Sequence, residues 1–343
     1  MEATVFDRIR QNLLQQRWGL MNWLRTTPAQ KKKIHLGPEP EAAAQKHLQI
    51  LETALEKTED QSLGMCEVCD DYIEPSLLEM DYTACVCLSH FSPEERSQLE
   101  DDLELSQKVQ KALLPQQAPE IPGLDVAAFS QPAQIVGGDY FDFCRFQDDA
   151  HGLVIADVMG KGMSASLLMA SLQASLRILV PENCSPAEVV NRLNHIFCHN
   201  IHLTKFVTMF LGRFDPRTYT LTYSNAGHNP PLLFHQEANS GEPVCWLMPT
   251  GPAIGLVEEF RVEEQTVTLR PGDILLLYTD GVTEAMNLEE EEFGTERLAA
   301  FLRQSANLSP AELVRELRTR LRDFTNGQPL ADDTTVVVCK VEA

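Results

Sequence analysis

Basic side chains are scarce in this chain of 343 residues. It carries 28 Lys and Arg against 50 Asp and Glu, so its formal net charge is −22. Both nucleic acid and anionic membranes would repel such a protein, so we expect it to bind neither. The shortage is uneven, because residues 1–48 have a net charge of +4 and include the basic run Lys31–Lys33.

Long apolar runs are also missing. No segment approaches the roughly 20 apolar residues that a membrane-spanning helix needs, and the N-terminus lacks the apolar core of a signal peptide. We therefore expect a cytoplasmic protein without a membrane partner. In a reducing compartment its nine cysteines, an odd number, should be thiols or metal ligands rather than disulfides.

A regular alternation of strands and helices is absent, which argues against a Rossmann fold or a TIM barrel. Several strand-like segments instead follow one another with helices between them, which favours an α+β fold with largely antiparallel sheets and helices outside. The expected strands are 123–130, 140–146, 152–158, 206–213, 219–224, 273–279 and 334–341. The expected helices are 162–180, 186–201, 295–304 and 310–323.

Shorter parts precede this region. We expect a helical N-terminal region at 1–61, a Cys-rich module at 62–91, a linker helix at 92–115 and a larger domain at 116–343. The pattern Ser-Pro-x-Glu, which predicts a capping box with Pro in the first helical position, begins three helices at Ser92, Ser185 and Ser309. The linker helix carries a partial apolar stripe, and either its own domain or a partner chain could cover it.

Carboxylates recur where strand-like runs break into turns or loops. The residues concerned are Asp139, Asp142, Asp157, Asp280, Asp332 and Asp333. Any one of them alone is best explained as a turn residue. Together they offer the hard oxygen ligands that Mg²⁺ or Mn²⁺ prefers, and two such ions about 3.5–4 Å apart can clamp a phosphoryl group.

Motifs in a fixed order make residues 105–343 resemble the SpoIIE/RsbU branch of the metal-dependent PPM-type Ser/Thr protein phosphatases. They are Gly137–Asp142, Asp157–Gly162, Asn225–Pro231, Tyr278–Gly281 and Asp332–Thr335. The resemblance implies a sandwich of two antiparallel sheets flanked by helices, with a two-metal site at one end. It also implies hydrolysis of phosphoserine or phosphothreonine on a protein by a water that two Mn²⁺ or Mg²⁺ ions activate.

The resemblance also assigns roles to residues of these motifs. Asp157 would bridge both ions, and the backbone carbonyl of Val158 would complete one ligand shell. Asp280 and Asp332 would hold the other ion, and Asp139 would lie behind the ligands or bind through water. These four aspartates are the predicted catalytic residues.

Other residues of the motifs receive lesser roles. The family's last motif uses its first Asp as ligand, so Asp333 is a secondary metal candidate, and Asp142 is expected to be structural or peripheral. His228 could be a general acid or a turn residue that bonds the backbone, and we favour the turn residue. Lys161 is the only basic residue inside the motifs, so metal ions would have to neutralise most of the local charge.

The family resemblance also bears on partners. It implies that the substrate is a phosphorylated signalling protein, such as an anti-sigma-factor antagonist. It further implies that the helix before the catalytic domain transmits activation and that the chain forms a homodimer.

The Cys-rich module has the spacing of a zinc site. Cys66 and Cys69 are followed after seventeen residues by Cys87 and His90. Two ligand pairs on two tight turns can close a tetrahedral zinc shell, and so short a module would need the metal to fold. Cys85 is the alternative to His90 as the fourth ligand.

Residues 40–91 resemble the zinc finger of the DksA/TraR-type transcription regulators. The match departs at His90, where that family has Cys, and the long coiled coil of that family is absent or short, so binding to RNA polymerase is not implied. We interpret the module as structural zinc that serves regulation or dimerisation. The leading hypothesis is thus a zinc-regulated protein phosphatase, and the alternative is a transcription-associated regulator that uses the phosphatase fold as a scaffold.

Overall fold

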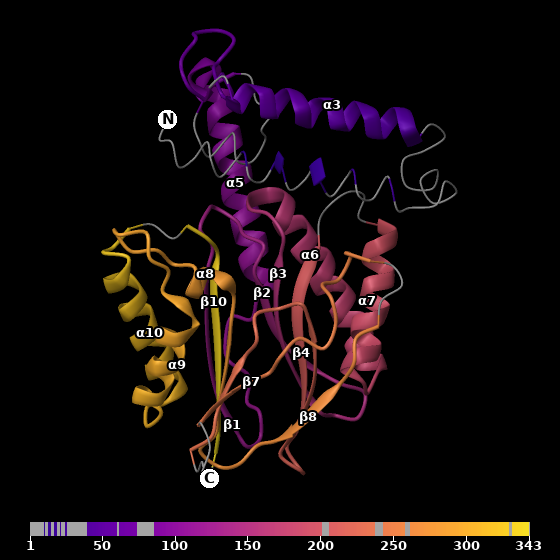
Figure 1. The fold of residues 1–343 in the computed structure, drawn as a ribbon, viewed down its shortest axis with the longest axis vertical. Coiled ribbons are helices and arrows are strands. Elements are labelled where there is room, and N and C mark those ends of the chain that lie inside the picture. Colours follow the sequence, from indigo (N-terminus) through magenta and orange to yellow (C-terminus); the bar gives the residue numbers. More distant parts are fainter. Residues whose placement is uncertain are drawn as a thin grey trace.

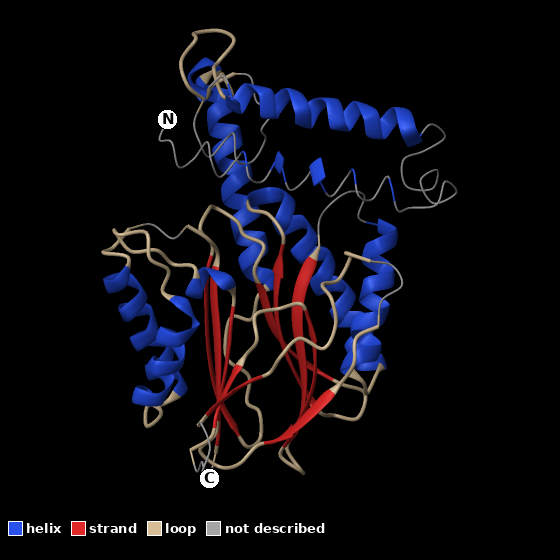
Figure 2. Ribbon diagram, in the orientation of Figure 1, coloured by secondary structure: helices blue, strands red, loops and turns tan. Residues whose placement is uncertain are grey.

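The computed structural model describes residues 10, 13–14, 17–18, 21, 25, 40–59, 62–73, 86–200, 206–236, 243–257, 261–328 and 331–342. Within these residues, two five-stranded sheets pack face to face with helices on both outer faces (Figure 2). The expected sandwich of antiparallel sheets flanked by helices is therefore confirmed. The basic run Lys31–Lys33 lies outside the described residues.

Every strand pair in the two sheets is antiparallel. The first sheet has the order β1 (Leu124–Gln131), β10 (Thr334–Val341), β9 (Ile274–Tyr278), β6 (Leu232–Phe234) and β7 (Val244–Trp246). The second has the order β2 (Tyr140–Arg145), β3 (His151–Val158), β4 (Val207–Asp215), β5 (Thr220–Ala226) and β8 (Gln265–Thr268).

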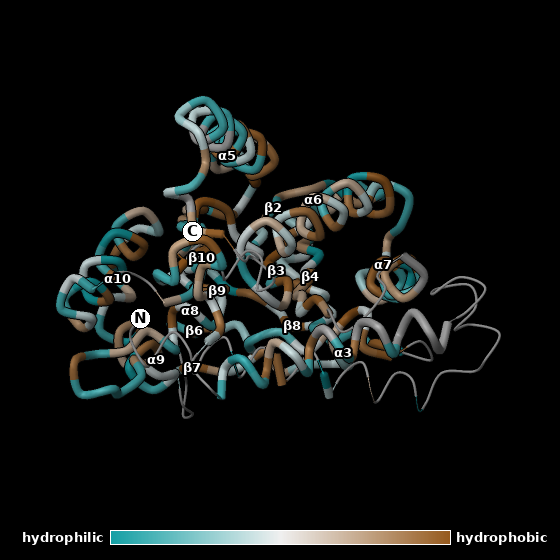
Figure 3. The backbone as a smooth tube through the Cα atoms, turned by 90° about the horizontal axis from the view of Figure 1, so that it is seen from above, coloured by the Kyte–Doolittle hydropathy of each residue, from teal (hydrophilic) through white to brown (hydrophobic). Residues whose placement is uncertain are grey.

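The helices form the outer layers of the sandwich. Seen from above, α9 (Gly294–Ser305) and α10 (Pro310–Phe324) lie on one side, and α6 (Gly162–Leu179) and α7 (Pro186–Asn200) lie on the other (Figure 3). Three clusters of buried apolar side chains correspond to the three interfaces between these four layers. Burial of this apolar surface is the main force that holds the layers together.

One helix corrects the expectation that no segment could span a membrane. The segment Gly162–Glu182 is long and apolar enough to cross a membrane, by length and composition alone. Its buried side chains, Met169 and Leu172 among them, pack into the cluster between α6, α7 and the second sheet. Its apolar character is thus explained by its place in the core of the sandwich.

The long elements begin and end close to where the sequence predicts, and the short ones do not appear in the prediction. The strands β6, β7 and β8 have three or four residues each, too few for a periodic pattern. Full capping boxes form at Ser92 and Ser309. At Ser185 the hydroxyl accepts from the Glu188 N–H, but it donates to Glu264, which also accepts from the Ala187 N–H.

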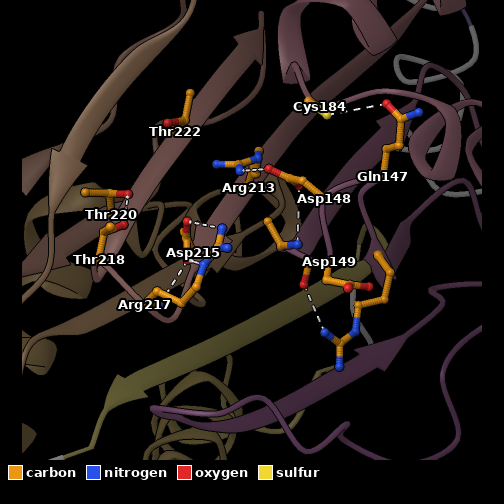
Figure 4. Close-up of polar contacts among 12 residues, drawn as sticks. Gln147, Asp148, Asp149, Cys184, Arg213, Asp215, Arg217, Thr218, Thr220 and Thr222 are labelled. Carbon is orange, nitrogen blue, oxygen red and sulfur yellow. Dashed lines mark hydrogen bonds and ion pairs between the residues drawn. The ribbon is translucent and has the colours of Figure 1, made fainter.

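Ion pairs hold the turns at one end of the second sheet (Figure 4). Arg213 on β4 pairs with Asp148 in the turn between β2 and β3. In the turn between β4 and β5, Arg217 binds Asp215 through its guanidinium and its backbone N–H and lowers the pKa of that carboxyl to about 2. The predicted metal-binding carboxylates lie at the opposite end of the sandwich.

In the part of the chain that the structure describes, the helices α3 (Pro40–Glu59) and α5 (Pro93–Leu113) extend beyond the sandwich (Figure 1). The linker helix α5 runs from the sandwich to the Cys-rich module, and α3 lies across that end of the molecule. Next to Cys87, the short helix η1 (Leu88–His90) carries the last predicted zinc ligand. The Cys-rich module therefore connects to the sandwich through a single helix of 21 residues.

Candidate active site

Antiparallel pairing brings the predicted carboxylates to the same end of the two sheets. In the second sheet Tyr140 pairs with Ala156, so Asp139, just before β2, lies beside Asp157 at the end of β3. In the first sheet Val336 pairs with Tyr278, so the start of β10 meets the end of β9. Asp332 and Asp333 precede β10, and Asp280 follows β9 and begins the short helix α8 (Asp280–Thr283).

Hydrogen bonds join the two sheets at this end. Thr279, after β9, donates its hydroxyl to Asp139 Oδ2 at 2.8 Å. Asp333 accepts from the Gly138 N–H at 2.6 Å and from the Ala133 N–H at 2.8 Å. The loop before β2 is thereby fixed to the loop before β10, although about 200 residues separate them in sequence.

The carboxylates raise one another's pKa values. Burial, followed by the charges of Asp280, Asp332 and Asp333, raises the pKa of Asp157 well above its ordinary value. Burial together with Asp332 and Glu284 raises the pKa of Asp280 to about 6. Cations bound beside buried carboxylates that repel one another in this way would favour their ionised forms.

Asp139 is buried, with 5% exposed, much like Asp333 with 4%. Burial and the charges of Asp157 and Asp333 raise its pKa well above the ordinary value. Because it also accepts a hydrogen bond from Thr279, it is held in one position relative to Asp157. This arrangement suits a carboxylate that orients ligands or binds a metal through water.

The donor set fits divalent cations. Asp157, Asp280 and Asp332 come from both sheets and supply only oxygen, which suits Mn²⁺ and Mg²⁺. No three carboxylates of the described residues bring their ligand oxygens within 4.8 Å of one another. As they stand, these oxygens do not close the shell of a single ion.

Glycine permits a close backbone approach at the site. A Cβ added to Gly138 would lie only 2.6 Å from the carbonyl oxygen of Val158, which is the predicted backbone ligand. Any side chain at Gly138 would displace that carbonyl or the loop before β2. The Gly-Gly-Asp sequence is thus explained by packing against β3, in addition to any role of Asp139 as a ligand.

The Lys161 side chain contacts the carboxylate cluster directly, which the sequence does not predict. Its Nζ is 2.9 Å from Asp332 Oδ2 and also donates to the Ala331 carbonyl. The ammonium partly neutralises the cluster at the point where Asp332 is expected to hold an ion. A cation bound by Asp332 would therefore compete with Lys161 for the same oxygens.

Two other predicted residues have structural roles. Asp142 is 3% exposed, accepts from the Tyr140 hydroxyl at 2.7 Å and pairs with Arg177 at 2.8 Å. His228 is 1% exposed, lies 2.8 Å from the Thr208 hydroxyl and donates its N–H to Asn225. Burial lowers the pKa of His228 to about 4, so it is neutral at pH 7 and fits the turn residue rather than the general acid.

Some residues around the site are not evident from the sequence. The Gln110 side chain, on α5, donates to the Gly137 carbonyl at 2.6 Å and accepts from the Gly137 N–H at 3.1 Å. Glu284 lies one helical turn beyond Asp280, and burial with the charges of Glu292 and Asp332 raises its pKa. Thr279 could have been noticed from its place beside Asp280, but no local pattern marks Gln110.

The Cys-rich module gathers its predicted ligands. Cys66, Cys69, Cys87 and His90 present ligand atoms that all lie within 4.8 Å of one another. The N–H groups of Val68 and Cys87 each donate to Cys66 Sγ at 3.4 Å, which favours a thiolate there. Three sulfurs and one imidazole nitrogen fit a structural zinc ion, and Cys85 lies outside the described residues.

A family model described as Stage II sporulation protein E (SpoIIE) matches residues 147–342. The chain belongs to the SpoIIE family. The match includes Asp157, Asp280, Asp332 and Asp333, and it begins after Asp139. The Cys-rich module lies outside it, so the likeness of that module to DksA/TraR zinc fingers stays a prediction.

Curated relatives agree with this membership. The chain is 28% identical to phosphoserine phosphatase RsbU of Bacillus subtilis over 245 residues, which are 71% of each protein. It is 26% identical to phosphoserine phosphatase RsbP of Bacillus subtilis over 187 residues, or 53% of this chain and 45% of RsbP. The predicted enzyme class, a metal-dependent phosphatase, is thereby confirmed.

The fold itself is found in solved structures. The SiaA-PP2C domain of Pseudomonas aeruginosa aligns with a TM-score of 0.64 and 22% identity, over 72% of this chain and 99% of that domain. The PP2C phosphatase domain of SpoIIE from Bacillus subtilis, solved with a fragment of its regulatory domain, aligns with a TM-score of 0.54 and 21% identity, over 64% and 63%. At these identities the likeness concerns the fold alone.

Proposed function

We propose that this protein hydrolyses phosphoserine or phosphothreonine on a signalling protein. The proposal rests on one observation: four aspartates from both sheets meet at one end of the sandwich, namely Asp139, Asp157, Asp280 and Asp332. Burial and mutual repulsion raise the pKa values of Asp139, Asp157 and Asp280. The names of RsbU and RsbP, both phosphoserine phosphatases, support the choice of substrate group. A phosphorylated anti-sigma-factor antagonist is a substrate of the proposed kind.

The catalytic metal would be Mn²⁺ or Mg²⁺, two ions per site. Asp157, the Val158 carbonyl, Asp280 and Asp332 would hold them, with Asp333 as a further candidate. When bound, the ions supply the positive charge that an anionic phosphate needs and lower the pKa of water. The chain's own residues hold these carboxylates in place by hydrogen bonds. The Thr279 hydroxyl donates to Asp139, and the N–H groups of Gly138 and Ala133 donate to Asp333.

The Cys-rich module would bind one structural Zn²⁺ and would act on the catalytic site through α5. This proposal is supported by the gathered ligands at one end of α5 and by the contact of Gln110 with Gly137 at the other. Homodimerisation is a further proposal. It is supported by α5, which leaves Leu105 59% and Val109 53% exposed, more than a helix covered by its own domain would.

The proposal is tested with the full-length protein, Mn²⁺ and two substrates, a phosphoserine peptide and p-nitrophenyl phosphate. We expect Mn²⁺-dependent hydrolysis of both, reduced about 100-fold or more in Asp157→Asn, because a ligand that faces both ions is lost. The matched control is Asp125→Asn, which changes an exposed carboxylate on β1 and should retain full activity.

Absence of Mn²⁺-dependent turnover on both substrates would contradict the proposal. The scaffold alternative would then gain support if the same inactive protein co-purified with RNA polymerase. Equal activity of Asp157→Asn and the unmodified protein would show that these carboxylates do not hold the catalytic ions.

A further inference from the structure

A groove of about 410 Å³ lies between α10 and the edge strand β1, apart from the carboxylate cluster. Figure 1 shows α10 along the outer face of the sheet that contains β1 and β10. Three arginines of α10, Arg315, Arg318 and Arg322, line the groove together with Phe129 and Gln131 of β1. No function has so far been given to this surface.

The charge of the groove is opposite to that of the protein. The whole chain carries a net charge of −22, and its catalytic cluster is built of carboxylates. Among the described residues that line the groove, three are Arg and none is Asp or Glu. Such a local reversal of sign attracts anionic groups that the rest of the surface repels.

The spacing of the arginines favours an extended chain over a single small anion. Positions 315, 318 and 322 lie on one face of the helix, and seven residues of helix span about 10 Å. An extended segment covers that length in about three residues. All three side chains are exposed, so their guanidinium groups are open to a ligand along this whole length.

One of the arginines is held in place. The guanidinium of Arg318 lies over the ring of Phe129, 3.9 Å from its centroid, and this contact fixes the side chain across the groove. Arg322 makes only a 3.7 Å contact with the exposed Asp323. A carboxylate from a ligand could replace that weak contact at little cost.

The groove leads to the catalytic end of the sandwich. Its lining includes Gln131 and Thr334, which pair across β1 and β10. Thr334 follows Asp333 directly, and Asp333 accepts from the Ala133 N–H two residues beyond Gln131. A chain lying in the groove would therefore have its continuation next to the carboxylate cluster.

We infer that this groove binds an acidic segment of the phosphoprotein substrate and so guides its phosphoserine to the site. The inference rests on the proposed phosphatase function for its substrate. Guanidinium groups recognise carboxylates in paired hydrogen bonds, so Asp and Glu side chains are the expected contacts. The groove supplies the attraction that an acidic substrate needs beside an acidic active site.

The test compares the full-length protein with the triple variant Arg315→Gln/Arg318→Gln/Arg322→Gln. Two fluorescent phosphoserine peptides are used, one with Glu on both sides of the phosphoserine and one with Gln at the same positions. Binding is measured by anisotropy without metal, and hydrolysis is measured with Mn²⁺. The metal-free binding experiment reports on the groove even if the phosphatase function fails.

We expect the unmodified protein to bind the Glu peptide at least about tenfold more tightly than the Gln peptide, and the triple variant to lose this preference. The preference should weaken as salt is raised. In hydrolysis the variant should raise KM for the Glu peptide and leave kcat on p-nitrophenyl phosphate unchanged.

Two controls separate docking from folding. Arg320→Gln removes one charge from the same helix outside the groove, where Arg320 contacts Glu316 and Gln304, and it should keep the preference. Replacing the three groove arginines with Lys keeps the charge but loses the paired hydrogen bonds, so it should restore only part of the binding. Equal binding of both peptides by the unmodified protein, or an unchanged preference in the triple variant, would overturn the inference. Displacement of the Glu peptide by millimolar inorganic phosphate would also overturn it, because the groove would then be a small-anion site.

Discussion

At the scale of single residues, the carboxylate cluster is a source of instability in the absence of cations. Asp139, Asp157 and Asp280 all have raised pKa values because burial and neighbouring charges disfavour their ionised forms. The only ammonium group described beside them is Lys161, at 2.9 Å from Asp332. A cation bound among these carboxylates would relieve their mutual repulsion.

The raised pKa of Asp280 predicts how the stability of the metal-free protein changes with pH. Its pKa is raised to about 6 in the folded protein, above the ordinary value of 3.8, so the folded state binds a proton more tightly than the unfolded state. This contribution to stability is full below pH 3.8 and is lost as the pH rises through 6. At pH 7 without metal, Asp280→Asn should therefore raise Tm by about 3 °C or more.

Thermal unfolding of metal-free protein at pH 4 and pH 7 checks this prediction. The difference in Tm between Asp280→Asn and the unmodified protein should be small at pH 4 and large at pH 7. Asp125→Asn should show no such dependence on pH. Added Mn²⁺ should stabilise the unmodified protein more than Asp280→Asn. A difference in Tm of the same size at both pH values would contradict the raised pKa of Asp280.

At the scale of elements, α5 is the connection between the Cys-rich module and the site. Its Gln110 makes two hydrogen bonds to the backbone of Gly137, next to the Gly138 N–H that Asp333 accepts. A shift of α5 would thus move the loop that carries Asp139. The helix itself is stable at its start, because Ser92 and Glu95 form a capping box there.

Removal of the Gln110 side chain should weaken catalysis more than folding. We expect Gln110→Ala to lower kcat or the affinity for Mn²⁺ about tenfold, as is usual when a group that orients ligands is lost. Tm should change little, because the side chain is only partly buried and its contacts join two separately folded elements. The control is Gln107→Ala, an exposed position one turn earlier on α5. Equal kinetics in both variants would show that the contact does not position the loop.

At the scale of the whole molecule, the two proposed metal sites, which differ in chemistry, lie towards the two ends of α5. Oxygen ligands gather in the sandwich, and sulfur and nitrogen ligands gather in the module of Cys66, Cys69, Cys87 and His90. Soft thiolates select zinc, and hard carboxylates select Mn²⁺ or Mg²⁺, so each site should retain its own metal.

Metal analysis of the purified protein should give one zinc per chain. Cys66→Ser should remove that zinc, since it removes one of four ligands from a closed shell. The exposed Cys184, which contacts Gln147 in the sandwich, provides the control: Cys184→Ser should keep the zinc. Asp157→Asn should also keep it, because that residue belongs to the other site. Full zinc content in Cys66→Ser would remove the proposed site.

The sequence by itself determined the long elements and the candidate ligands. Strands such as β3 and β10 are built around runs of apolar, mostly β-branched residues, and the capping boxes at Ser92 and Ser309 depend on neighbours within three residues. Signals of this kind are local, so they can be read without a fold. Short strands such as β6 and β7 could not be predicted, because three residues define no period.

Only the tertiary structure decided which of these residues meet. Thr279 reaches Asp139 across 140 positions, and the Arg318 guanidinium reaches Phe129 from another layer of the fold. The contact of Gln110 with Gly137 and of Lys161 with Asp332 likewise joins separate elements. Such contacts follow from the pairing order of strands and the packing of layers, which the whole chain fixes through burial of its core and no local pattern records.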